Sequence, residues 1–355
     1  MIESVKKRCT DLLSRASIAV GVSLCILLVL FLWTITRKSP NLYVREFTVF
    51  GTYARLTFYA QEQQAEKAAD AIQERLQELN NRINIFDDQS ELSQLNRTAH
   101  TTPFQCSEPL WTLLSVCRQA YERTNGAFDI SVGPLLRLWG FHEKRDRYPA
   151  PQDVQQALAA VGLNEVVFTP AERSVRFTHP DSYLDFGGVA KGYGLDLAVR
   201  VARKHGIERG IIDLGGNVYC FPLPPPGKDV YTVAIRDPFH PNAFVGKVHL
   251  LDQCVATSGN YENKRTLNGR LVHHIIDPRT GYPVPHVASV TVITPQGVDS
   301  DIFATAVFVA GMPLAKDLCR ETPRTGILRI VQSDKGRTAI ETCNWPGSLA
   351  TNCKR

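Results

Sequence analysis

The 355-residue sequence lacks the short motifs that mark several common kinds of nucleotide and hydrolase chemistry. It contains no G-x-x-x-x-G-K-[ST] loop, no G-x-G-x-x-G opening a helix after a strand, no G-x-S-x-G and no H-E-x-x-H. These absences argue against a P-loop nucleotidase, a Rossmann dehydrogenase, an α/β-type serine hydrolase and a zinc protease. The chain also has no internal repeat, which argues against a solenoid.

Paired cysteines are lacking as well. The nine cysteines include no C-x-x-C pair, so neither a structural zinc site nor a thioredoxin-like centre is supported. Four are expected to be buried thiols: Cys106, Cys117, Cys220 and Cys254. Three more cluster late in the chain, where an oxidising compartment would allow a bridge: Cys319, Cys343 and Cys353.

The body of the chain carries almost no net charge. Of the formal net charge of +5, residues 1–40 carry +4, which leaves +1 for residues 41–355. A near-neutral body argues against a nucleic-acid-binding protein, which would present a basic face. The basic surplus at the N-terminus indicates membrane topology instead.

The sequence does contain one long apolar run, at residues 17–36, without a charged residue. About 20 such residues cross a bilayer as a helix, and Trp33 stands near the outer end, where an indole is favourable. We therefore predict a cytoplasmic N-terminus, an uncleaved anchor, a linker and a catalytic domain outside the cytoplasm, at residues 1–16, 17–36, 37–46 and 47–355. A cleavable signal peptide and a buried core helix are the alternatives.

Beyond the anchor, helical and strand patterns alternate without regular βαβ spacing. Helices are predicted at 65–83, from an N-cap at Ser107 to 121, and at 151–162, 190–206 and 301–311. A hairpin is predicted at 45–60 and strands at 210–216, 231–237, 246–251, 289–295, 325–332 and 337–342. This order favours the α+β class, with mixed or antiparallel sheets flanked by helices.

Two short stretches could bind an anion and a hard cation. In LDFGGVAKGYGLD (184–196), a strand ends at Asp185 and a helix begins near Ala190, so amides at the helix start and Lys191 could attract phosphate. Asp301 and Thr305 stand four apart on a predicted helix and could supply oxygen ligands to Mg²⁺. The plainer alternatives are a tight turn with a solvated lysine and a first-turn acid that favours the helix dipole.

Three further stretches carry polar groups at the ends of apolar runs. They are VATSGNYE (255–262), GAFDISVGPLLRLWGF (126–141) and HHIIDPRTGYP (273–283). The last one is stiffened by prolines and places two histidines side by side, and histidine is the side chain that titrates near neutrality. Because neighbours in an extended segment face opposite ways, we expect one of these histidines to face a ligand and the other to face away from it.

Together these stretches resemble the ApbE family of FAD:protein FMN transferases. The resemblance covers roughly residues 47–311 and rests on motifs in this order: F-G-T (50–52), S-E-L-S-Q-L-N (90–96), G-A-F-D-I-S-V-G-P-L (126–135), L-D-F-G-G-V-A-K-G-Y-G-L-D (184–196), D-L-G-G-N (213–217), A-T-S-G-N-Y (256–261), H-H-I-I-D-P-R-T-G-Y-P (273–283) and D-I-F-A-T (301–305). It implies a T-fold-like α+β architecture. It also implies a Mg²⁺-dependent transfer of FMN from FAD to a Thr or Ser hydroxyl of a target protein, with release of AMP.

The resemblance also implies roles for particular residues. His274 would act as the base, and His273, which faces the other way, would be structural or lie at the rim. The metal would be held by Asp301, Thr305 and a backbone carbonyl near Gly188. FAD would be contacted by Ala127, Phe128, Asp129, Asp185, Lys191, Thr257, Ser258 and Ile276, and by two aromatic positions that depart from the family's usual Met and Tyr, Phe50 and Phe86. The implied target is a subunit of a membrane redox complex, and the implied location is the periplasmic side of a bacterial inner membrane.

Two other functions remain compatible with the same residues. Water could replace the target hydroxyl, which would give an FAD pyrophosphatase that releases free FMN and AMP. A non-catalytic flavin-binding envelope protein is the second alternative, but it would have no need of the Asp301–Thr305 pair together with a histidine base.

Overall fold

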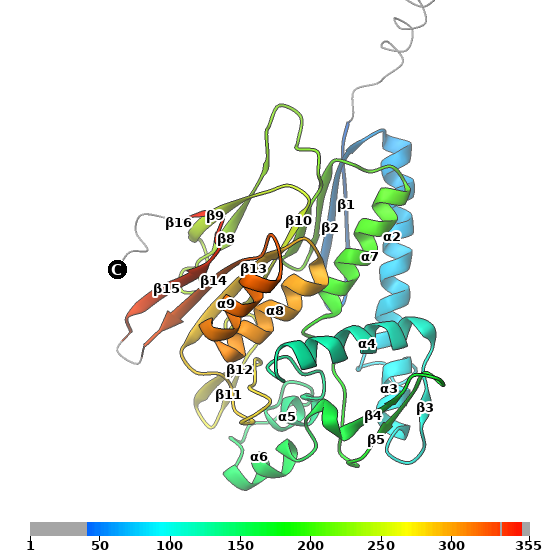
Figure 1. Cartoon of the computed structure of the whole chain (residues 1–355), viewed down its shortest axis with the longest axis vertical. Coiled ribbons are helices and arrows are strands. Elements are labelled where there is room, and N and C mark those ends of the chain that lie inside the picture. The colour runs from blue at the N-terminus through cyan, green and yellow to red at the C-terminus, as the bar shows by residue number, and fades with distance from the viewer. Residues whose placement is uncertain (1–40, 334–335, 350–355) are drawn as a thin grey trace, which may run out of the picture. The chain divides into compact units, whose positions relative to one another are not determined.

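The computed structural model describes residues 41–333 and 336–349, and its first element is the predicted hairpin. It consists of β1 (Asn41–Val49) and β2 (Thr52–Ala60) (Figure 1). Phe50 and Gly51 form the turn with φ of 53° and 69°, the positive values that a two-residue hairpin turn requires. Residues 41–46, predicted to be linker, instead form the first part of β1, because Tyr43 and Phe47 pack against the hydrophobic core.

The hairpin opens an eight-stranded sheet, the largest within the described residues. The strand order is β1-β2-β6-β7-β10-β13-β14-β15, and the six pairings from β2 to β15 are antiparallel. The added strands are β6 (Gly210–Leu214), β7 (Asn217–Cys220), β10 (Gln253–Gly259), β13 (Val287–Thr294), β14 (Gly326–Gln332) and β15 (Thr338–Cys343). The α+β prediction with antiparallel sheets is therefore confirmed.

Four helices cover one face of this sheet (Figure 1). They are α2 (Glu62–Ile83), α7 (Ala190–Lys204), α8 (Gly297–Ala310) and α9 (Met312–Glu321). The helix predicted from Asp301 begins four residues earlier, at Gly297, and most of its residues are buried because it packs against α7, β10 and β13. The other face is covered by a small sheet of β16 (Ser348–Leu349), β9 (Phe244–Leu250) and β8 (Tyr231–Arg236), with a separate apolar cluster between the layers.

Shorter elements complete the described chain. They are α3 (Glu91–Thr98), α4 (Glu108–Arg123), α5 (Gly133–Leu138), α6 (Pro151–Leu158), the 3₁₀ turn η1 (Leu163–Glu165), the sheet β3 (Phe104–Gln105), β5 (Ser174–Phe177) and β4 (Val166–Thr169), and the hairpin β11 (Lys264–Leu267) and β12 (Arg270–His273). Ser107 caps α4 as predicted. The predicted anchor at 17–36 lies outside the described residues, and among the described ones no helix is both long and apolar enough to cross a membrane.

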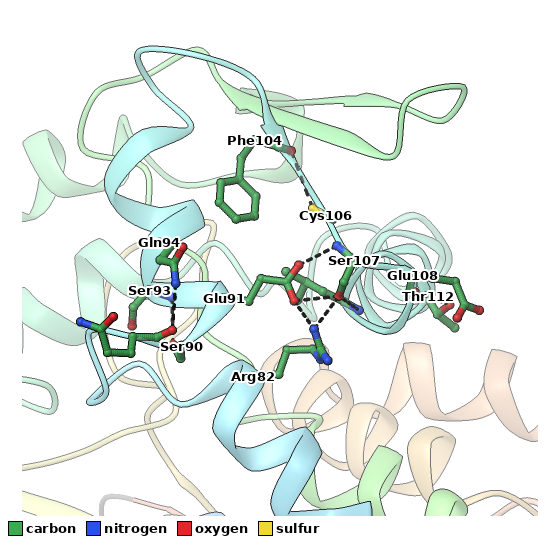
Figure 2. Close-up of polar contacts among 12 residues, drawn as sticks. Arg82, Ser90, Glu91, Ser93, Gln94, Phe104, Cys106, Ser107, Glu108 and Thr112 are labelled. Atoms are coloured by element: carbon green, nitrogen blue, oxygen red, sulfur yellow. Dashed lines mark hydrogen bonds and ion pairs between the residues drawn. The ribbon is translucent and has the colours of Figure 1, made fainter.

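The S-E-L-S-Q-L-N stretch is α3, and its polar residues are structural. Figure 2 shows Glu91 between Arg82 of α2 and Ser107 at the start of α4. The Glu91 carboxylate accepts hydrogen bonds from the Ser107 amide (2.6 Å) and hydroxyl (2.7 Å), and from Arg82 (2.5 Å). Ser90 caps α3 through the amide of Ser93. One carboxylate therefore ties three helices together.

This network gives a stability prediction. Glu91→Ala should lower the free energy of unfolding by about 2 kcal/mol, because it leaves the Arg82 guanidinium and the Ser107 amide without their shared acceptor. The matched control is Glu78→Ala, which removes an exposed pair with Arg75 on α2 and should cost no more than about 0.5 kcal/mol. Urea unfolding followed by circular dichroism measures both, and equal losses would contradict the assignment.

Candidate active site

A cavity of about 260 Å³ lies where the first turn of α7 and the 301–305 part of α8 meet the end of β10 and the 273–283 segment. It gathers every predicted site residue except Phe50: Phe86, Ala127, Phe128, Asp129, Asp185, Gly188, Lys191, Thr257, Ser258, His274, Ile276, Asp301 and Thr305. These residues come from six separate stretches of the chain. Their convergence depends on a small number of contacts.

The closest of these contacts joins α7 to α8. A Cβ on Gly192 would lie 2.3 Å from the Gly297 carbonyl oxygen, and a Cβ on Gly297 would lie 2.7 Å from the Gly192 carbonyl oxygen. Only glycine permits this approach. Asp196 of α7 accepts the amides of Gly297 (2.7 Å) and Val298 (2.9 Å), so it satisfies the first turn of α8. The K-G-Y-x-x-D pattern (191–196) therefore serves mainly to pack α7 against α8.

The same contact places the charged side chains of the cavity. The Asp301 carboxylate, 4% exposed, accepts the Gly192 amide at 2.8 Å and lies 3.9 Å from the Lys191 ammonium. The amides of Val189 and Ala190 are bonded to the Phe186 carbonyl. Most amides at the start of α7 are therefore used within the protein, and the Lys191 side chain is the main positive group left to meet an anion.

The predicted metal ligands form a set of oxygen donors. The Thr305 hydroxyl lies one turn from Asp301 on α8 and 3.2 Å from the Ser258 hydroxyl at the end of β10. Gly188 lies against it, since a Cβ there would be 3.7 Å from Thr305 Oγ1. A carboxylate, a hydroxyl and a neighbouring backbone carbonyl suit a hard cation such as Mg²⁺. No group of three His, Cys, Asp or Glu converges within the described residues.

Asp185 is positioned by backbone contacts on both sides. Asn96 of α3 clamps the preceding residue, accepting the Leu184 amide (2.8 Å) and donating to its carbonyl (2.9 Å). The Asp185 amide in turn donates to the Ile130 carbonyl at 2.7 Å. The Asp185 side chain accepts the Gly187 amide at 2.5 Å, which shapes the turn that leads to Gly188.

The two adjacent histidines face different surroundings, as predicted. His274 lines the cavity, and its Nδ1 lies 3.3 Å from the Asn263 carbonyl. Because a carbonyl only accepts, the proton sits on Nδ1 and leaves Nε2 free as an acceptor. Burial lowers the pKa of His274 to about 4, so the ring is neutral at pH 7. His273 instead bonds the Val284 carbonyl (2.9 Å) and packs on Phe308.

The rest of the 273–283 segment braces this arrangement. Arg279 forms a two-pronged ion pair with Asp277 (2.9 and 2.8 Å). Gly281 turns the chain with φ of 79°, and its carbonyl accepts the Trp139 indole N–H at 2.8 Å. The two charged residues of the segment therefore hold a turn.

Two predicted ligand residues are already engaged in the protein. The Asp129 carboxylate accepts the amide and hydroxyl of Ser131 (2.8 and 2.6 Å), and burial raises the pKa of Asp129 to about 6. The Thr257 hydroxyl pairs with the Thr291 hydroxyl across the β10–β13 ladder at 2.9 Å.

Phe50 lies outside this cavity. It lines an adjoining hollow of about 470 Å³, which shares four residues with the first: Ile85, Phe86, Asp185 and Gly187. Phe86, 74% exposed, stands between the two hollows. An extended ligand could therefore touch both aromatic positions.

Two ionisable residues of the cavity, His142 and Glu262, were not predicted from the sequence. Burial raises the pKa of Glu262, which sits near Lys191 and Asp301. Glu262 directly follows the A-T-S-G-N-Y motif, and this adjacency could have indicated it. His142 follows the apolar L-W-G-F stretch, and no local pattern marks it.

The fold and the cavity together define a class: an α+β protein whose cavity combines oxygen donors, a lysine and a neutral histidine without a P-loop or Rossmann motif. The family model "ApbE family" matches residues 50–328. The chain belongs to the ApbE family.

Sequence relatives agree with this assignment. An FAD:protein FMN transferase of Salmonella typhimurium is 31% identical over 294 residues, 80% of this chain and 83% of the relative. Another from Klebsiella pneumoniae is 31% identical over 278 residues (76% and 79%), and one from Treponema pallidum is 30% identical over 321 residues (85% and 88%).

Solved structures agree on the fold. The ApbE protein of Thermotoga maritima is 29% identical, with a TM-score of 0.78 over 86% of this chain and 97% of its own. The flavin transferase ApbE of Vibrio cholerae is 26% identical, with a TM-score of 0.76 over 86% and 98%.

Proposed function

We propose that this protein is an FAD:protein FMN transferase, which moves FMN from FAD to a Thr or Ser hydroxyl of another protein. Membership in the ApbE family supports this activity. The observation that carries it is the meeting, in one cavity, of a neutral histidine, a lysine and the Asp301–Thr305–Gly188 oxygen set. Phosphoryl transfer at a pyrophosphate needs three things: a group that accepts a proton, a positive charge, and oxygen ligands for a hard cation.

His274 performs the proton step in this proposal. Its free Nε2 accepts the proton of the target hydroxyl while the hydroxyl oxygen forms a bond to the FMN phosphorus. The bond from that phosphorus to the bridging oxygen breaks, and AMP leaves with the bridging oxygen and the electron pair. A neighbouring base of this kind accelerates transfer by about 10²–10⁴-fold.

FAD binding is assigned to the two adjoining hollows. Lys191 offsets charge on the pyrophosphate, while Asp185 and the 127–129 stretch line the cavity beside it. Ser258, Thr257 and Ile276 line the same cavity. Phe86 borders both hollows and Phe50 lines the second, so both aromatic rings are assigned to FAD binding.

The cation assigned to this site is Mg²⁺. The donors fit it, since carboxylate, hydroxyl and carbonyl oxygens are the ligands it prefers, and waters complete its shell. Asp301, Thr305 and the Gly188 carbonyl would hold it. When bound, Mg²⁺ supplies charge neutralisation on the non-bridging phosphate oxygens.

We assign the target protein and the location from the same resemblance and from the apolar run. The target is a redox protein at the membrane, with a Thr or Ser that receives FMN. Residues 17–36 anchor the chain in a bacterial inner membrane, with the catalytic domain on the periplasmic side.

The central test is a transfer assay. Full-length protein in detergent, FAD, Mg²⁺ and a candidate acceptor domain should give a fluorescent acceptor band that survives denaturation. Asp301→Ala should lower the transfer rate by about 100-fold or more. The matched control is Asp299→Asn, two residues away on α8 and outside the cavity, which should keep near-normal activity.

Other outcomes separate the alternatives. Free FMN and AMP without labelled acceptor would indicate an FAD pyrophosphatase, and FAD binding without turnover would indicate a flavin-binding protein. Full activity of Asp301→Ala would refute the metal assignment.

The second test separates the two histidines. His274→Ala should lower transfer by about 10²–10⁴-fold while FAD still binds, because only the proton acceptor is lost. His273→Ala should retain transfer and lose stability, because it removes the bond to Val284. The pH profile of kcat/KM should show no acidic limb at 6.5, since burial lowers the pKa of His274 to about 4. An inactive His273 variant would reverse the assignment.

The third test concerns the anchor. Full-length protein should stay in the membrane pellet after alkaline carbonate extraction, whereas a chain lacking residues 1–40 should be released. Protease added to spheroplasts should digest the catalytic domain of the full-length protein. Release of the full-length protein by carbonate would refute the anchor, and protection from protease would refute the periplasmic location.

A further inference from the structure

His142 lies in a segment that is held rigidly at the mouth of the cavity. The segment follows α5, which ends in a Schellman motif: Phe141 donates to the Leu136 carbonyl (2.8 Å), and Gly140 donates to the Arg137 carbonyl with φ of 78°. Trp139, fully buried, anchors the segment to Gly281. His142 therefore projects from a fixed backbone.

The His142 ring makes one strong polar contact. Its Nε2 lies 2.7 Å from Asp185 Oδ2, and the two side chains are only 9% and 11% exposed. A carboxylate at this distance fixes the tautomer, with the proton on Nε2. The other Asp185 oxygen accepts the Gly187 amide. Both carboxylate oxygens are thus oriented by donors from the protein.

Aromatic rings hold the imidazole in place. Phe86 meets it edge-on at 6.1 Å between centroids, and Tyr183 lies 5.9 Å away on another side. Its Nδ1 is buried and has no hydrogen-bond partner. A buried nitrogen without a partner costs free energy, so the ring is kept in this position by its neighbours and by the bond to Asp185.

The preceding residue, Phe141, contacts a different residue of the cavity. The Phe141 ring contacts the His274 ring edge-on at 6.3 Å. Two consecutive residues of one anchored segment therefore contact Asp185 and His274, which arrive from distant parts of the sequence.

From this arrangement we infer that His142 is a positioning residue: through its Nε2–H it fixes the Asp185 carboxylate in the orientation that receives a hydroxyl or N–H donor of FAD. This inference rests on the proposed function for the identity of the ligand. An Asp185 carboxylate already fixed at both oxygens still has lone pairs for such a donor. Without the His142 bond the carboxylate keeps only the Gly187 amide to orient it, and FAD binding weakens.

The test measures FAD binding by quenching of flavin fluorescence, with full-length protein in detergent, Mg²⁺ and no acceptor. His142→Phe keeps a ring between Phe86 and Tyr183 but has no donor, and should raise the Kd for FAD about tenfold or more. His142→Gln places an amide nitrogen near the former Nε2 and should stay within about threefold of wild type. His142→Asn is too short to do so and should resemble His142→Phe.

Two controls separate positioning from general structural damage. His240→Phe removes another histidine–aspartate pair, in which the exposed His240 is bonded to Asp237 at 3.2 Å, and should leave the Kd unchanged. In an Asp185→Asn background, His142→Phe should add less than about twofold, because the group it orients is already changed.

The contrary outcomes are clear. Unchanged binding by His142→Phe, equal weakening by the Gln and Asn variants, or a full additional tenfold loss in the Asp185→Asn background would each overturn the inference. Wild-type protein that binds FAD but labels no acceptor would contradict the proposed transferase activity and leave this binding test intact.

Discussion

The close packing of α7 on α8 is the contact on which the site depends. Gly192 and Gly297 let the two backbones approach to a distance that any side chain would prevent. Asp196 then satisfies the amides at the start of α8, and Asp301 returns a carboxylate to the Gly192 amide. The result places a lysine in the first turn of α7 beside a buried carboxylate in the second turn of α8.

Other parts of the site are positioned by contacts between residues that are far apart in the sequence. Asn96 holds the backbone before Asp185 from 88 residues away, and Trp139 holds the Gly281 turn from 142 residues away. Several ionisable residues of the motifs, among them Glu91 and Asp277, likewise hold the backbone and do not line the cavity. Their carboxylates are fully engaged by protein donors, so they fix geometry and leave the cavity to other groups.

Burial sets the chemistry of the groups that remain. It lowers the pKa of His274 to about 4 and raises the pKa of Asp129 to about 6, in each case because it penalises the charged form. A neutral imidazole with its Nδ1 proton directed at a backbone carbonyl can only accept at Nε2. The same fold that shields the site from water thus fixes the direction of proton transfer in the proposed reaction.

The sequence by itself determined the local structure and the list of candidate groups. Helical periodicity, strand alternation and the Ser107 cap depend on neighbours a few residues away, and the ordered motifs indicated the family and thirteen of the residues that line the cavity. The tertiary structure alone decided that Phe50 lies in the adjoining hollow and that His142 meets Asp185. Such outcomes depend on side chains brought together across more than 40 residues by packing, and no local pattern contains that information.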